Sequence, residues 1–538
     1  MPEHTHTLAT LDWLVIGGYL CAILGLALWL ARSQHNRIDY FVAGRRIGAW
    51  PVALSVMATQ CSTNSILGAP AFVAFAAGGG LVWLQYELAV PLAMIVLMLF
   101  ILPRFHSLQL LSIYGFLEQR FDIRTRRVLS GLFLFVRAFA TAVTVYGVAL
   151  VIDLITGLGF VTSVLLLGAF TVLYDCMGGI RGVIYSDVIQ LLILTAVLVL
   201  VLYTLVVDAG GAAALLDSFQ PERRLALDFG GLGITDGQTF GFWPMLLGGL
   251  FLYVSYYGCD QSQVQRMLCT ENARETNRAL FINGLLRFPL VALYCAVGVG
   301  IGVYALNNPG FLGQLPATET GPEVNLAVPV YMMSSLPAGV VGLGLVALFA
   351  AAMSSLDSVI NSLSASTMED FIRPLRKNEW PEHQDIWWSR AVTAGWGGIT
   401  VGMSFFVGDI APTVLEAINK IGSLANGPVL AVFVLGFYSR SISGTGAITG
   451  LLLGMLCNGL CWLYLPDLSW LWWNPIGFAV AVIAASACQR LMPGRQPPAR
   501  HEGDTDATDL PSLAPSQRRW SGLLALWFFV LLAALAVL

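Results

Sequence analysis

Hydroxyl and carboxylate side chains recur at helical spacing within residues 350–370, in a stretch that follows an apolar run. At 100° per residue these groups share one face of a helix. That face carries Ala351, Ser354, Ser355 and Ser358, with Asp357 beside them and Asn361 extending the stripe. A carboxylate at the centre of a bilayer costs about 2.5–3.5 kcal/mol, so we expect a partner that offsets this cost.

The oxygen atoms of this face indicate the kind of partner. Hydroxyl and carbonyl oxygens beside one carboxylate suit a hard, weakly charged cation such as Na⁺, whereas zinc prefers thiolate or imidazole. The alternative is that these serines only join neighbouring helices or bond their own backbone, which is the commoner role of a single serine in a membrane helix. Four hydroxyl or carboxylate groups within five positions favour ion binding.

The composition places the chain in a membrane. Of its 538 residues, 57% are hydrophobic and 11% charged, whereas soluble domains carry about 25% charged residues. The chain has no basic tract long enough to bind nucleic acid. Its nine cysteines include no CxxC pair and are interpreted as small buried hydrophobes rather than a disulfide framework. No Walker-type segment occurs, so we expect neither ATP as the energy source nor an enzymatic activity.

Apolar runs long enough to cross a bilayer predict an all-α polytopic protein with about fourteen transmembrane helices. These runs lie near residues 11–31, 50–78, 84–103, 128–152, 160–177, 183–207, 240–258, 279–305, 336–360, 390–408, 412–438, 443–464, 468–488 and 520–538. Most of the 28 Lys and Arg residues fall in loops that follow odd-numbered spans. The positive-inside rule therefore predicts a multi-pass protein of the cytoplasmic membrane with both termini on the non-cytoplasmic side.

The second predicted span is interrupted by a polar block at residues 59–65, followed by Gly68 and Pro70. Irregular backbone at membrane depth is tolerated only where it lines a cavity or is buried in protein. The carbonyl groups freed by such a break are ready ligands for a cation. The alternative is a kinked helix with ordinary interhelical hydrogen bonds.

Four further charged side chains are predicted within spans or at their ends: Glu87, Arg137, Asp187 and Arg287. Glu87 and Arg287 are candidates either for solute binding or for a structural ion pair. Asp187 either complements a helix dipole or completes a second cation site beside the serine face. Arg137 is expected to snorkel toward the cytoplasmic surface, and residues 260–266 are expected to reach that face.

The chain resembles the sodium:solute symporter family, which includes sodium–glucose, sodium–proline, sodium–iodide and sodium–monocarboxylate transporters. The resemblance covers about residues 39–440. It rests on the polar second span together with DYFVAGRR (39–46), GGIRGVIYSDVIQ (178–190), DQSQVQR (260–266) and AAAMSSLDSVINS (350–362). It implies a LeuT-type core of two inverted five-helix repeats that works by alternating access.

The resemblance also implies where ions bind. The shared sodium site would use backbone carbonyls of Ala58, Cys61 and Ala351 and the hydroxyls of Ser354 and Ser355. Relatives that bind a second sodium use an acid at the position of Asp187, together with hydroxyls around the serine pair, so the second site is expected to involve Asp187, Asp357 and Ser358. Asp357 stands where some relatives carry an uncharged residue, so this extra carboxylate either strengthens the second site or admits a proton.

For the solute, the resemblance and the polar block of the second span select eight positions. These are Gln60, Ser62, Ser65, Glu87, Tyr253, Tyr256, Arg287 and Asn419. Ser65 and Tyr253 replace amides that sugar carriers use, so a small organic anion such as a monocarboxylate, meeting Arg287, is expected rather than a sugar.

The sequence therefore predicts a sodium-coupled symporter that imports a small organic solute, with Na⁺ as the coupling ion, no cofactor and no obligate protein partner. Proton coupling, a transporter-fold membrane sensor and a channel are the alternatives. The predicted parts are a first helix and loop (1–49), the LeuT-type transport core (50–440), accessory helices (441–488), a disordered cytoplasmic linker (489–519) and a last transmembrane helix (520–538).

Overall fold

The computed structural model describes residues 8–61, 63–318, 321–376, 380–407, 414–492 and 514–538, which are almost entirely helical. The first helices are α1 (Thr10–Ala31), α2 (Arg37–Val42), α3 (Ala49–Gln60), α4 (Thr63–Phe75), α5 (Leu84–Glu87), α6 (Ala89–Val96), α7 (Leu102–Ser107), α8 (Gly115–Arg120), α9 (Ile123–Thr156), α10 (Phe160–Asp208), α11 (Ala212–Ser218) and α12 (Pro221–Arg224). The remaining helices are α13 (Gly249–Cys259), α14 (Gln261–Met267), α15 (Ala273–Asn307), α16 (Ala327–Ser335), α17 (Val340–Ser366), α18 (Glu382–Val407), α19 (Val414–Tyr438), α20 (Gly444–Tyr464), α21 (Trp473–Leu491) and α22 (Pro515–Leu535).

Short turns and one small hairpin connect these helices. The 3-10 turns are Ala43–Arg45, Leu81–Trp83, Leu312–Gln314, Val324–Leu326, Arg373–Leu375 and Trp470–Trp472, and the π-helical turns are Leu97–Ile101, Pro244–Gly248 and Thr367–Ile372. Strands β1 (Ala317–Thr318) and β2 (Gly321–Pro322) pair antiparallel, with Ala317 opposite Pro322.

Among the described residues, ten helical segments are long and apolar enough to cross a membrane. The structure therefore supports a multi-pass helical protein but does not confirm the predicted count of fourteen. One reason is α10, a single run of 49 residues that covers two predicted spans. Since about 20 helical residues cross a bilayer, a count by length and hydropathy scores this run once.

The two halves of α10 meet at Gly179, whose φ of 54° and ψ of −166° lie outside the helical region. A Cβ atom at Gly179 would lie 2.9 Å from the carbonyl oxygen of Tyr40, so the chain needs glycine here both for its conformation and for its close contact with α2. This turn places the second half of α10, with Asp187, beside α17.

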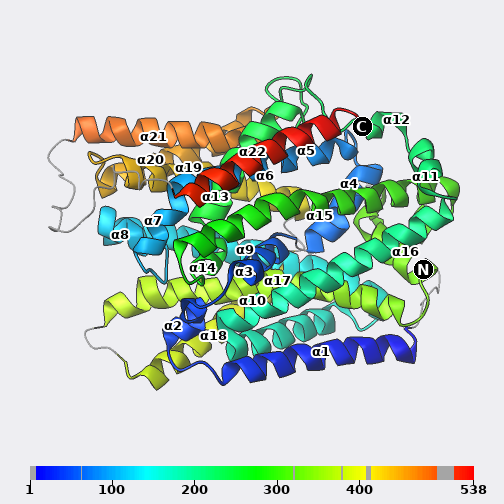
Figure 1. The fold of residues 1–538 in the computed structure, drawn as a ribbon, viewed down its shortest axis with the longest axis horizontal. Helices are drawn as coiled ribbons and strands as arrows, with labels where there is room; N and C mark the ends of the chain where they lie inside the picture. Colours follow the sequence, from blue (N-terminus) through cyan, green and yellow to red (C-terminus); the bar gives the residue numbers. More distant parts are fainter. Residues whose placement is uncertain (1–7, 62, 319–320, 377–379, 408–413, 493–513) are drawn as a thin grey trace.

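The long helices run roughly along the longest axis of the molecule, and the start of α1 and the end of α22 lie toward the end that carries α11, α12 and α16 (Figure 1). Helix α17 is buried in the middle of the bundle and packs against α1, α3, α9 and α10. Its start is held by Asp12 of α1, whose Oδ1 accepts from the backbone N–H groups of Gly339 and Gly342 at 2.7 Å each. The polar face of α17 therefore points at other helices rather than at lipid.

Candidate functional site

The helix formed by the second predicted span is broken where the polar block predicted irregular backbone. Helix α3 ends at Gln60, Cys61 has non-helical angles (φ −81°, ψ 62°), and α4 begins at Thr63. The last carbonyl groups of a helix have no partner within it. The break therefore leaves the carbonyls of Ala58 and Thr59 available to groups on a neighbouring helix.

The hydroxyls of α17 lie against these carbonyls. The Oγ atom of Ser354 is 3.4 Å from the Ala58 oxygen and 3.1 Å from the Ala351 oxygen. The Oγ atom of Ser355 is 3.3 Å from both the Thr59 and the Ala351 oxygens. The structure thus brings together hydroxyl and carbonyl oxygens from two helices, and this donor set fits a monovalent hard cation.

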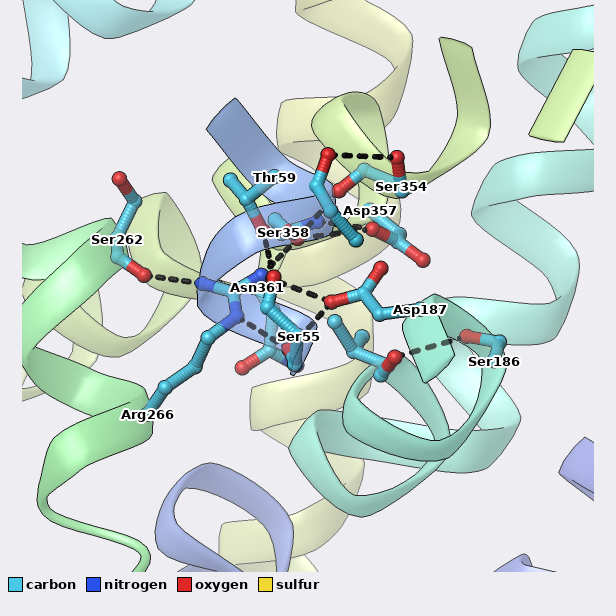
Figure 2. Close-up of polar contacts among 12 residues, drawn as sticks. Ser55, Thr59, Ser186, Asp187, Ser262, Arg266, Ser354, Asp357, Ser358 and Asn361 are labelled. Atoms are coloured by element: carbon cyan, nitrogen blue, oxygen red, sulfur yellow. Dashed lines mark hydrogen bonds and ion pairs between the residues drawn. The ribbon is translucent and has the colours of Figure 1, made fainter. Parts of the chain in front are cut away.

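A second polar cluster surrounds Asp187 (Figure 2). Its Oδ2 accepts from Ser55 Oγ at 2.5 Å and lies 3.4 Å from Nη2 of Arg266. The guanidinium also donates to Ser55 Oγ through Nε at 2.7 Å and to the hydroxyl of Ser358 through Nη2. The predicted residues Asp187, Asp357 and Ser358 belong to one cluster. Arg266 contacts Asp187 and Ser358, and Asp357 Oδ1 accepts from the Ser358 hydroxyl at 3.1 Å.

Arg266 is the residue of this cluster that the sequence interpretation misplaced. It was expected to reach the cytoplasmic face with residues 260–266, but its side chain is fully buried. Acceptors on α3, α10 and α17 surround the guanidinium, so burial does not leave its charge uncompensated. The sequence shows that this arginine belongs to the 260–266 motif, but it does not show that the side chain is buried.

Tyr174 and Thr59 were also missed as members of the cluster. The Tyr174 hydroxyl donates to Oδ2 of Asp357, and the hydroxyls of Thr59 and Ser358 lie 3.1 Å apart. Thr59 therefore links the second cluster to the carbonyls at the end of α3.

A cavity of about 310 Å³ adjoins the break between α3 and α4. Six of the eight predicted solute positions line it, namely Gln60, Ser65, Glu87, Tyr253, Tyr256 and Arg287. Ser62 and the side chain of Asn419 lie outside the described part of the chain. Ser355 and Thr59 line the same cavity, so the oxygens beside the cation-type site also face the space that a solute can enter.

Glu87 and Arg287 form a buried ion pair in the cavity wall. Nε of Arg287 lies 3.1 Å from Oε2 of Glu87, and the Tyr253 hydroxyl donates to Oε1 of Glu87 at 3.1 Å. Nη1 of Arg287 contacts the Cys61 sulfur at 2.6 Å. The pair presents both donors and acceptors next to the end of α3, which suits a polar solute.

Arg137 is the second arginine of the cavity wall, and its side chain is 22% exposed. Its Nε lies 2.5 Å from Oδ2 of Asp260, and its guanidinium carbon lies 4.8 Å from the centre of the Tyr256 ring. An acid at the end of α13 and an aromatic face therefore bind this partly exposed cation.

Helices long and apolar enough to cross a membrane, a polar cavity and clustered hydroxyl, carbonyl and carboxylate oxygens are features of secondary transporters. The chain belongs to the sodium:solute symporter family, whose sequence model matches residues 40–454. It is 30% identical over 479 residues to the sodium/sialic acid symporter NanT of Aliivibrio fischeri, covering 88% of this chain and 92% of that protein. It is 28% identical to the human sodium-coupled monocarboxylate transporter 1, covering 84% and 73%.

The fold is also similar to a solved symporter. A Na⁺-coupled sialic acid symporter, solved in a substrate-bound, outward-open state with a novel Na⁺ site, superposes with a TM-score of 0.79 at 26% identity, covering 90% of this chain and 98% of that one. Family, relatives and fold together identify a sodium-coupled transporter rather than an enzyme, with Na⁺ as the coupling ion.

Proposed function

We propose that this protein imports a small organic anion together with Na⁺ across the cytoplasmic membrane, by alternating access of a core (residues 50–440) built from two inverted five-helix repeats. Residues 441–488 and the last helix would be accessory, and both termini would lie on the non-cytoplasmic side. Of the predicted linker 489–519, residues 493–513 lie outside the described part of the chain, and its two ends belong to α21 and α22. The start of α1 and the end of α22 lie toward the same end of the molecule (Figure 1), which supports placing both termini on one side of the membrane.

One observation carries the proposal: Ser355 and Thr59 border both the cation-type oxygens and the cavity. In the proposed site, Na⁺ is held by the carbonyls of Ala58, Cys61 and Ala351 and by the hydroxyls of Ser354 and Ser355. An ion bound there would fix the broken end of α3 against α17. The same backbone break forms part of the solute-binding wall, so ion binding and solute binding would stabilise one arrangement of these helices.

The second proposed site uses Asp187, Asp357 and Ser358. One sodium ion moving inward through 100 mV releases about 2.3 kcal/mol, so a second ion would double the electrical driving force. The rival within the transporter class is proton coupling, which the buried carboxylate of Asp357 and its bond from Tyr174 favour.

Uptake into proteoliposomes distinguishes these functions. We expect radiolabelled solute to accumulate when an inward sodium gradient is imposed, and accumulation to stop when a sodium ionophore dissipates that gradient. The solutes to compare are sialic acid, lactate, pyruvate, acetate, proline and glucose. Accumulation driven by a pH gradient in sodium-free buffer would contradict sodium coupling and establish the proton alternative.

The proposed anion would be held by the two arginines of the cavity. We expect Arg287→Leu and Arg137→Leu each to raise the solute concentration for half-maximal uptake by about tenfold or more, since a hydrogen bond to a charged group contributes about 1.5–3 kcal/mol. The measurement is solute-concentration dependence at saturating sodium. Arg278→Leu is the control, because this guanidinium is 47% exposed and pairs loosely with Glu275 at 3.8 Å. A solute affinity unchanged in both cavity variants would exclude an anion held by arginine.

A further inference from the structure

Asp175 is a fully buried carboxylate that neither proposed sodium site uses. It lies on α10, four residues before the turn at Gly179. Its Oδ1 accepts from Nδ2 of Asn361 at 3.2 Å, whereas its Oδ2 has no hydrogen-bond partner among the described residues. Leaving a buried oxygen unsatisfied costs about 1–3 kcal/mol, and more when the group is charged.

A second unsatisfied oxygen belongs to the same chain of hydrogen bonds. Nε2 of Gln265 donates to Asn361 Oδ1 at 2.9 Å and to the Phe41 carbonyl at 2.7 Å. These two acceptors fix the orientation of the amide, and Oε1 of Gln265 is then left without a partner in the described part of the chain. The three side chains, all fully buried, therefore carry two oxygens that can still accept a bond.

This group is the neighbour of the Asp187 cluster. Asn361 follows Asp357 by one turn of α17, and Gln265 precedes Arg266 on α14. The contact of Gln265 with Phe41 places the group next to α2, and Asp175 is closer in sequence to the turn at Gly179 than Asp187 is. Helices α10, α14 and α17 thus supply two adjoining polar clusters, and the cluster of Asp175, Asn361 and Gln265 lies toward α2.

The charges of the two clusters do not balance. Asp175, Asp187 and Asp357 are fully buried acids, and Arg266 is the buried cation that pairs with Asp187. No salt bridge of the described residues includes Asp175 or Asp357. Uncompensated charge at membrane depth is expensive, so two further positive charges are needed to neutralise three ionised acids. A sodium ion in the proposed second site supplies one of them.

We propose that Asp175, Asn361 and Gln265 form an additional binding station for a monovalent hard cation, which Na⁺ occupies between the Asp187 cluster and the cytoplasm. One carboxylate and amide oxygens suit Na⁺ and are a poor set for transition metals. The station rests on the proposed coupling to sodium and extends it. An ion that leaves the Asp187 cluster would pass to Asp175, whose partner Asn361 lies one helical turn after Asp357 on α17. A proton on Asp175 is the competing occupant of this group, and the experiment below distinguishes a bound proton from a bound Na⁺.

Equilibrium binding of ²²Na⁺ to the purified full-length protein in detergent tests the station. We expect the wild-type isotherm to contain a weak component that Asp175→Asn removes, with its affinity reduced at least about tenfold, as for other losses of groups that support a metal. In proteoliposomes, the same variant should slow uptake at saturating external sodium, because release to the inside is impaired. Gln265→Met should weaken the same component and serves as the second variant if Asp175→Asn fails to fold.

Two variants make the outcome specific. Asp217→Asn removes an exposed carboxylate on α11 and should leave the isotherm unchanged. Ser354→Ala should remove the tight component and spare the weak one, so a failure of the proposed sodium site is distinguished from a failure of the station. The proposed station is wrong if the sodium-binding isotherms of Asp175→Asn and Gln265→Met both match that of the wild type. A change confined to the pH dependence of uptake also overturns it, because a proton is then the occupant.

Discussion

Replacing Arg266 with methionine should abolish sodium-coupled uptake and destabilise the protein by about 3–5 kcal/mol, the usual cost of removing one partner from a buried ion pair. The guanidinium is the cation that pairs with Asp187, and it also holds the hydroxyls of Ser55 and Ser358. Without it, the carboxylate of Asp187 stays in the protein interior beside Asp357. The measurements are the midpoint of thermal unfolding in detergent and sodium-driven uptake.

A charge-matched double variant separates stability from transport. Combining Arg266→Met with Asp187→Asn removes both charges, so we expect much of the lost stability to return while uptake stays absent. Arg278→Met, at an exposed ion pair, should change stability by about 0–1 kcal/mol. If Arg266→Met unfolds at the wild-type temperature, the buried pair does not stabilise the fold as argued.

Replacing Ser354 or Ser355 with alanine should raise the sodium concentration for half-maximal uptake by about tenfold or more. Each substitution removes one hydroxyl from the oxygen set at the end of α3 and leaves the packing of α17 nearly unchanged. The sodium dependence of uptake is measured at saturating solute. The double variant should show a larger shift than either single variant.

Ser362→Ala is the matched control for these two variants. Ser362 is also buried on α17, but its hydroxyl bonds carbonyls of its own helix, those of Ser358 and Val359, at 2.9 Å each. Its loss should leave the sodium dependence unchanged. Equal sodium dependence in wild type, Ser354→Ala and Ser355→Ala would remove the basis for the proposed first site.

The sequence alone determined the features that depend on neighbouring residues. Helical periodicity placed Ser354, Ser355 and Ser358 on one face of α17, and the structure has that face against α3 and α14. The polar block at residues 59–65 predicted irregular backbone, and α3 and α4 are separated there. Composition and spaced motifs identified a membrane transporter of this family. Such patterns depend on residues that are close in sequence, so they predict structure without knowledge of which helices pack together.

The tertiary structure decided which charges are paired and where. Arg266 and Asp187 are 79 residues apart in the chain, Arg137 and Asp260 are 123 apart, and Asn361 and Asp175 are 186 apart. The segment around each side chain does not show which distant residue it contacts. A buried charge is stable only beside a partner, and that partner comes from another helix. The burial of Arg266, the pairing of Arg137 with Asp260 and the chain of bonds that ends on Asp175 follow from helix packing and not from local sequence.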